Sequence, residues 1–583
     1  MTAPWEYRDP LESPLTAEVS ARRLMEHVRT IGALERESGS PGEAQAFDYI
    51  ERTLKAFGVE VERREIEAYI SLPLEGRLRL PDGSVIEGLT HSFSPSVEAL
   101  EGEVVDVGDG RPEDYRRTGA AGKLALVRGL ATPGKAWVAQ QAGTLGQIFV
   151  VADHLHNMIV TTIWGTPAPE TAWRLPATPC LSILGADGQR LHDLLAFPPL
   201  RVHLTTRVRT GWTPIPHLVG SLTGRVEDRF LLLSGHVDAW HQGAMDNGSA
   251  NATMLEVARL LAGRRDALRR GIRFAFWSGH SHGRYAGSAW YADHAWRELH
   301  ARCVLHLNVD STGARGATDY SVLHATEEAQ RLAETVVADV TGQRARGRRF
   351  TRAGDQSFWG AGVPSAFMAL SGIPRQDTEL SRQMERLVGS AGFPWWWHTR
   401  EDTVDKVDGD VLALDTKVYL TAALRGLNAP LLPLDHGRAA QSLLAELTSL
   451  QGAAGGRFDL APVLGAAQGL VERLERVTAA LGRVEPTATA ADALEAINRG
   501  LMRLSRILVP LAYTSGDRFT HDLALPLPPL AGLQRARELV ALDPDSDALK
   551  FARAALVREK NRALHALDSA ASVADELLSL ERR

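Results

Sequence analysis

Four residues of metal-ligating type stand beside apolar runs in the middle of the sequence. His236 follows the apolar stretch 230–233, and Asp246 precedes an apolar run with helical spacing. Asp310 ends a third apolar stretch, and His398 follows three consecutive tryptophans. Imidazole and carboxylate groups are good ligands for zinc and similar divalent metals. With one carboxylate bridging, two histidines and two aspartates form the core of a site for two cooperating metal ions.

The elements around these residues must bring them together. The stretch 230–233 is typical of a buried strand, and the run 252–261 is typical of a helix. Strands and helices alternate from 214 to 430, which predicts an α/β fold with a mostly parallel sheet covered by helices. Ligands gather at the strand ends of such sheets, so we expect the four residues to share one edge.

Seven short motifs resemble, in order and spacing, the zinc aminopeptidase and carboxypeptidase family that contains glutamate carboxypeptidase II and the transferrin receptor. The motifs are 235–238, 246–249, 256–259, 287–288, 308–310, 354–358 and 398–399. The resemblance implies one metal bound by His236, Asp246 and Asp310. It implies a second metal bound by Asp246, His398 and a glutamate. Asp238 is then expected to orient His236 and to belong to the catalytic machinery.

The chain departs from the family where two consecutive glutamates are expected, the first as general base and the second as metal ligand. The loop 278–283 reads Ser-Gly-His-Ser-His-Gly, which places His280 at the base position and Ser281 at the ligand position. The loop is one residue longer, so His282 is the expected replacement ligand, although the two histidines could exchange roles. Imidazole titrates near neutral pH and can serve as a general base.

The expected function is metal-dependent hydrolysis of an amide, peptide-like bond by a site for two divalent metal ions. Zinc is the expected metal, while a single ion or a different metal is left open. One alternative is a non-catalytic, receptor-like dimer that has lost the catalytic glutamate. Another is a metal-dependent lyase, or a hydrolase of a different C–N bond.

Four further residues are predicted to contact a small peptide or amide substrate. Trp397 directly precedes His398, and its indole can donate one hydrogen bond to a developing oxyanion. Asp355 lies in the Gly-Asp-Gln-Ser segment, for which a purely structural turn is the alternative. Arg284 and Tyr285 directly follow the histidine-containing loop.

The length of 583 residues exceeds what one core supports, so several domains are expected. Residues 1–97, with helices at 15–30 and 41–57, are interpreted as the N-terminal part of the catalytic domain. Residues 98–213 resemble the protease-associated domain, with a generic α/β insertion as the alternative. Residues 214–430 form the predicted catalytic domain. Residues 431–583 are helical in pattern and resemble the family's dimerisation domain, which implies a homodimer; a helical cap is the alternative.

The composition limits the partners. A net charge of −6 gives no reason to expect nucleic acid or an anionic membrane surface. Two cysteines cannot build a disulfide framework, and no apolar run reaches about 18 residues, the length a membrane helix requires. The N-terminal residues lack the pattern of a signal peptide. A cytoplasmic location is therefore expected.

Overall fold

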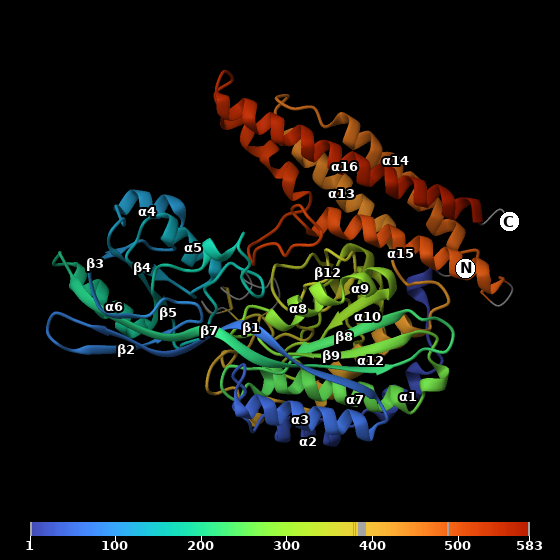
Figure 1. Ribbon diagram of the computed structural model, residues 1–583, viewed down its shortest axis with the longest axis horizontal. Helices are drawn as coiled ribbons and strands as arrows, with labels where there is room; N and C mark the ends of the chain where they lie inside the picture. Colours follow the sequence, from blue (N-terminus) through green and yellow to red (C-terminus); the bar gives the residue numbers. More distant parts are fainter. Residues whose placement is uncertain (1–2, 377, 379–380, 383–391, 487–488, 581–583) are drawn as a thin grey trace.

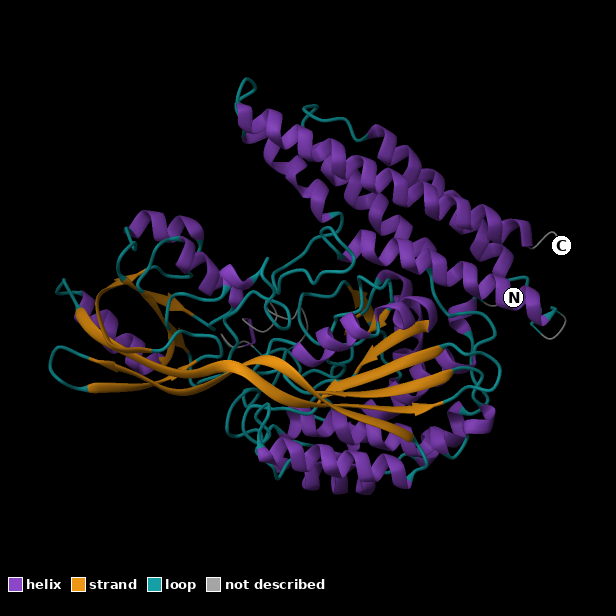
Figure 2. Cartoon of the chain, in the orientation of Figure 1, coloured by secondary structure: helices purple, strands orange, loops and turns teal. Residues whose placement is uncertain are grey.

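The computed structural model describes residues 3–376, 378, 381–382, 392–486 and 489–580. Within this part of the chain, the main sheet has the order β1-β2-β6-β5-β4-β3-β7-β9-β8-β10-β13. Its strands are β1 Glu60–Arg79, β2 Val85–Thr90, β3 Val97–Asp106, β4 Leu124–Arg128, β5 Gly146–Val151, β6 Cys180–Leu184, β7 Arg201–Leu222, β8 Phe230–His236, β9 Gly271–Trp277, β10 Cys303–Asn308 and β13 Ser365–Ala366. A separate parallel pair joins β11 Val322–His324 and β12 Arg346–Arg348. The predicted α/β class is confirmed (Figure 2).

The neighbouring strands β9, β8, β10 and β13 run parallel. All seven residues of β8 are buried, because helices cover both faces of the sheet here. His236 pairs with Trp277, and Asn308 pairs with Ser234, so the strands end close to the same level. The residues that follow these strands therefore meet at one edge.

Two long strands connect the two halves of the sheet. β1 and β7 pair antiparallel from Glu60↔Ser221 to Arg79↔His203, and they form the ribbon between the two lobes in Figures 1 and 2. The lobe beyond this ribbon contains β2 to β6. The predicted boundary between 213 and 214 falls inside β7, which continues through it without a break.

Helices lie on both faces of the catalytic half, with α2, α3 and α7 on one face and α8 and α9 on the other (Figure 1). Up to β13, the helices are α1 Glu12–Glu18, α2 Ala21–Ile31, α3 Pro41–Ala56, α4 Pro112–Thr118, α5 Pro133–Gln141, α6 Gly185–Leu195, α7 Ala250–Ala262, α8 Ala286–His294, α9 Trp296–Arg302 and α10 Glu327–Thr341. The single helix predicted at 15–30 is two helices, α1 and α2. They separate at Ser20, whose side chain accepts the backbone N–H of Arg23 and begins α2.

In the described residues after β13, the α-helices are α12 Gly409–Asn428, α13 His436–Ala453, α14 Ala461–Leu481, α15 Ala491–Tyr513 and α16 Asp547–Leu580. The last four pack together beside the catalytic lobe, which confirms the predicted C-terminal helical region (Figure 1). In the described part of the chain, no helix combines the length and apolarity that a membrane span requires. Cys180 and Cys303 are buried and free.

Candidate metal centre

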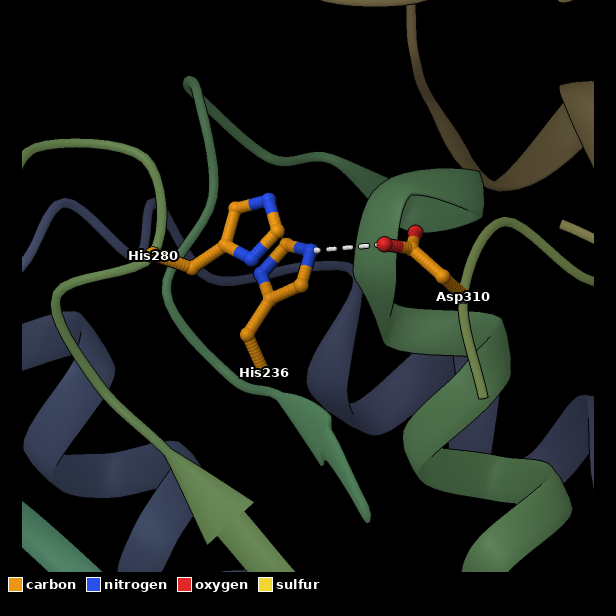
Figure 3. Close-up of side chains that lie close together, drawn as sticks. All are labelled: His236, His280 and Asp310. Carbon is orange, nitrogen blue, oxygen red and sulfur yellow. Dashed lines mark ion pairs between the residues drawn. The ribbon is translucent and has the colours of Figure 1, made fainter. Parts of the chain in front are cut away.

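Three ligand-type side chains meet where the parallel strands end. His236 is the last residue of β8, Asp310 follows β10 by two residues, and His280 follows β9 by three. Nitrogen or oxygen atoms of these three residues lie within 4.8 Å of one another. Figure 3 shows the two imidazoles stacked and the Asp310 carboxylate facing His236. The edge predicted from the strand pattern therefore collects residues from three separate βα connections.

The Asp246 carboxylate lies between two histidines. Its Oδ1 atom is 3.1 Å from Nε2 of His236, and its Oδ2 atom is 3.2 Å from Nε2 of His398. Asp310 approaches from the His236 side, with Oδ2 3.8 Å from the same Nε2 atom. Each oxygen of Asp246 thus faces a different imidazole, which is the arrangement expected of a carboxylate that bridges two metal ions.

Backbone carbonyls orient both histidines for metal binding. Nδ1 of His236 lies 2.7 Å from the carbonyl oxygen of Asp238, and Nδ1 of His398 lies 2.7 Å from that of Asn157. A carbonyl only accepts, so each Nδ1 carries the proton and each Nε2 keeps its lone pair. Nε2 of His236 is buried and has no hydrogen-bond partner. The donor set and its tautomers fit a zinc-type metal.

The electrostatics of the centre call for a positive charge. Burial lowers the pKa of His236, but the carboxylates of Asp246 and Asp310 outweigh it and raise that pKa well above its usual value. Burial raises the pKa of Asp246, yet the neighbouring imidazoles of His236 and His398 bring it well below its usual value. Two buried carboxylates around one nitrogen are stable only with a cation between them, either a proton or a metal ion.

Asp238 holds the histidine-containing loop in place. Its Oδ1 accepts the N–H of His280 at 3.2 Å, and its Oδ2 accepts the N–H of Ser281 and the hydroxyl of Ser38, each at 2.8 Å. The carboxylate is 3.7 Å from Nδ1 of His236, so it is the Asp238 carbonyl that orients this ring directly. Asp238 therefore connects His236, through its carbonyl, to the histidine-containing loop 278–283, through its carboxylate.

His280 is held by a carboxylate on the side away from the cavity. Its Nδ1 is 2.8 Å from Oδ2 of Asp355, and its ring stacks on His236 with a centroid distance of 3.7 Å. Asp355 is fully buried, and its Oδ1 accepts the hydroxyl of Ser288 at 2.7 Å. Asp355, predicted as a substrate contact, thus has both oxygens engaged by protein groups. The ring nitrogen left for the cavity is Nε2 of His280.

His282 lies behind the loop, away from the gathered ligands. Its Nδ1 accepts the N–H of Ser38 at 3.3 Å and lies 3.0 Å from the Ser38 hydroxyl. The ring is fully buried, 4.3 Å from the ring of Trp240, and its Nε2 has no hydrogen-bond partner. An accepting Nδ1 puts the proton on Nε2. In this structure His282 supports Ser38 and Asp238 rather than joining His236, Asp246 and His398.

The sequence interpretation missed Asp402, which positions Asp246. Its two carboxylate oxygens accept the backbone N–H groups of Met245 and Asp246, each at 2.9 Å. Burial raises the pKa of Asp402 to about 7. In the sequence, the feature that could have identified Asp402 as part of the site is its position four residues after His398.

Arg36 was also missed, because it comes from the N-terminal segment. It is fully buried, and its guanidinium donates to five backbone carbonyls. The acceptors are the carbonyl oxygens of Ile31, Leu34, Val237, Gln242 and Gly243. Three of these belong to the connection between β8 and Asp246, so Arg36 fixes the path that spaces His236 from Asp246.

A cavity of about 430 Å³ opens onto the metal centre. Trp397, Arg284 and Tyr285, all predicted substrate contacts, line it together with His280 and His398. The Trp397 ring stacks on His398 with a centroid distance of 3.5 Å. The Tyr285 hydroxyl accepts the backbone N–H of Gly354 at 3.2 Å, and burial raises its pKa.

The chain is similar to known peptidases in sequence. Residues 217–422 match the model of peptidase family M28. The chain is 25% identical to a probable glutamate carboxypeptidase, VP8, of Zea mays, over 70% of this chain and 67% of that protein. It is 24% identical to the probable lipoprotein aminopeptidase LpqL of Mycobacterium tuberculosis, over 69% of this chain and 84% of that protein.

Solved structures share the fold. The aminopeptidase from Aneurinibacillus sp. strain AM-1 superposes with a TM-score of 0.55 at 20% identity, over 71% of this chain and 96% of that one. A zinc aminopeptidase from Bacillus subtilis superposes with a TM-score of 0.53 at 20% identity, over 70% and 95%. Residues 217–422 thus match peptidase family M28, and the sequence relatives support a metallopeptidase-type hydrolase of the zinc aminopeptidase and carboxypeptidase family.

Proposed function

We propose that this protein hydrolyses an amide bond of a small peptide-like substrate with two divalent metal ions, zinc being the expected metal. The observation that carries the proposal is the Asp246 carboxylate, whose two oxygens face Nε2 of His236 and Nε2 of His398. Asp310 adds a ligand on the His236 side. When bound, the metals would polarise the substrate carbonyl and lower the pKa of a water molecule.

His280 is the proposed proton-transfer residue. Asp355 holds the proton on Nδ1, which leaves the lone pair of Nε2 to accept a proton from water and pass it to the leaving amine. Asp238 keeps the His280 backbone at the edge of the centre. His282 supports this network from behind, so the proposal gives the base role to His280 and requires no ligand from His282.

A second candidate arrangement holds one metal. It is favoured by the close approach of ring nitrogens of His236 and His280 to the Asp310 carboxylate, all within 4.8 Å. In this arrangement His280 is a ligand and cannot transfer protons. The number of bound ions separates the two candidates.

Three further parts of the proposal concern the rest of the chain. The β2–β6 lobe is proposed to be a protease-associated domain that shapes substrate access, since the α5 residues Pro133 to Lys135 line the cavity. The C-terminal helices are proposed to form a homodimer, supported by the 72% exposed Phe551 on α16. The buried free cysteines support a proposed cytoplasmic location.

The test is metal analysis by plasma mass spectrometry on untagged protein purified without chelator, followed by hydrolysis assays on aminoacyl and dipeptide substrates. Two ions per chain, with hydrolysis that a chelator abolishes and zinc restores, are expected. His280→Ala should keep two ions and lose most hydrolysis. One ion in the parent, or loss of an ion in His280→Ala, would support the single-metal arrangement. Metal-free protein after reconstitution would overturn the proposal.

A further inference from the structure

A further cavity lies in the C-terminal helical region, separate from the metal centre. Its volume is about 400 Å³, which suits a small molecule, and it shares no lining residue with the cavity at the metal centre. Helices α15 and α16, which pack against each other, form two of its walls (Figure 1). Residues 514–518 and the start of the 3₁₀ helix η6, Ala531–Ala541, complete it. The proposed hydrolysis uses none of these segments.

Aliphatic side chains line part of this cavity. Ile507 and Leu511 lie one turn apart on α15, and both are only partly buried. Leu530 and Leu533, at the start of η6, are almost fully buried beside them. Ala566 on α16 is small and leaves room between the helices. A surface of this kind favours a ligand with a hydrocarbon portion, because its burial removes apolar area from water.

Arg506 places a positive charge beside these aliphatic side chains. It lines the cavity, and only 6% of the residue is exposed. Within the described part of the chain it forms no ion pair with a carboxylate, and burial lowers its pKa to about 10, so it stays charged at neutral pH. Its guanidinium donates instead to the backbone carbonyls of Leu299, His300, Cys303 and Gly362. Carbonyls satisfy its hydrogen bonds but do not balance its charge, and a buried charge without a counter-ion is costly.

Two other arginines line the same cavity. Pro510 has no N–H to donate to the carbonyl of Arg506, one turn earlier in α15, and Nη2 of Arg518 donates to that carbonyl at 2.6 Å. Arg518 likewise has no carboxylate partner among the residues that the structure describes. Arg562 on α16 lies 3.5 Å from Glu559, whose carboxylate is the only one that lines the cavity. Three arginines and one glutamate make the cavity positively charged.

We propose that this cavity binds a small carboxylate with an aliphatic chain, of the kind found in a medium-chain fatty acid. The chain lies on the aliphatic side chains of α15 and η6, and the carboxylate meets Arg518 and Arg562 and offsets the charge of Arg506. Nη1 of Arg518 is free to donate, since Nε and Nη2 make the hydrogen bonds of this group. Guanidinium groups bind carboxylates through strong, charge-assisted hydrogen bonds. The site goes beyond the proposed function, because it requires neither the metal ions nor the substrate cavity.

The test is calorimetry of octanoate, uncharged octanamide and acetate with the full chain, in metal-loaded and in metal-depleted form. Octanoate should bind both forms equally. Octanamide and acetate should bind more weakly by roughly tenfold or more, because one lacks the charge and the other lacks the chain. Octanoate binding that requires the metals, or octanamide binding as tight as that of octanoate, would overturn the inference.

Two variants test whether octanoate binds in this cavity. Arg562→Gln removes the charge of a side chain that is 51% exposed, and Ala566→Leu fills the space between the helices. Each should weaken octanoate binding by roughly tenfold or more. Arg558→Gln changes an exposed arginine on the same helix that does not line the cavity, so this matched control should bind like the parent.

Octanoate binding that either Arg562→Gln or Ala566→Leu leaves unchanged would contradict the inference. Binding confined to a dissociated, monomeric form would also contradict it, because the cavity would then belong to an interface between copies of the chain. Neither result bears on the proposed hydrolysis, which is tested by metal content and by substrate turnover. Conversely, octanoate binding to a protein that hydrolyses no substrate would refute the proposed function and leave this site standing.

Discussion

The hydrogen bond between Asp355 and His280 allows the proposed base to be tested without disturbing the metal ligands. Asp355→Asn keeps the volume of the side chain. Ser288 donates its hydroxyl to Oδ1 at 2.7 Å, so the amide oxygen of Asn stays on that side and its NH₂ group faces Nδ1 of His280. Nδ1 must then accept, and the proton moves to Nε2. A protonated Nε2 on a neutral ring cannot act as a base.

The expected loss follows from this change of tautomer. General base catalysis contributes roughly 10²–10⁴-fold to a rate, so kcat of Asp355→Asn should fall by about that factor. The loss corresponds to about 3–5.5 kcal/mol of transition-state stabilisation. KM and metal content should change little, because neither the ligands nor the cavity wall is altered.

The assay compares kcat, KM and metal content of the parent, Asp355→Asn and Ser288→Ala. Ser288→Ala is the control, because it removes one hydrogen bond to Asp355 but leaves the carboxylate on His280. Its kcat should fall less than tenfold. A kcat for Asp355→Asn within threefold of the parent, at unchanged metal content, would refute the assignment of His280 as base.

Two other predictions concern buried groups outside the reaction. His282→Ala should lower the free energy of unfolding by about 2–4 kcal/mol, because it leaves a cavity and removes a hydrogen bond with Ser38. The metal content of His282→Ala and of the control Ser38→Ala should equal that of the parent. Loss of one metal ion in His282→Ala, but not in Ser38→Ala, would make His282 a ligand. Glu328 is fully buried without hydrogen-bond partners for its carboxylate, and burial raises its pKa from 4.5 to about 8. The folded chain keeps this proton while the unfolded chain loses it, so stability falls as the pH rises from about 4.5 to 8. In chemical denaturation, the free energy of unfolding of Glu328→Gln should match that of the parent near pH 4.5 and exceed it by roughly 4–5 kcal/mol at pH 9. The exposed control Glu475→Gln should show the same pH dependence as the parent. If Glu328→Gln also showed the pH dependence of the parent, the prediction would be wrong.

The sequence was sufficient to predict that His236 and Asp310 lie at the ends of neighbouring strands. His236 and Asp310 each follow a continuous apolar run, and parallel strands of similar register end at one edge of a sheet. The helical C-terminal region was predictable for a similar reason, since its apolar residues recur with the period of a helix. Each of these features depends on the pattern of apolar residues within one continuous segment, so the sequence alone was enough to predict it.

The tertiary structure alone decided where the two histidines of the loop 278–283 lie. His280 and His282 differ by two positions in sequence, yet one faces the centre and the other packs behind it against Ser38, 244 residues away along the chain. Asp355 was predicted from sequence as a substrate contact or part of a structural turn, and the structure places its carboxylate on His280, 75 residues away along the chain. A buried carboxylate such as that of Asp355 or Asp238 requires hydrogen-bond donors. These donors come from distant segments that pack around it, so no local sequence pattern predicts which residues they are.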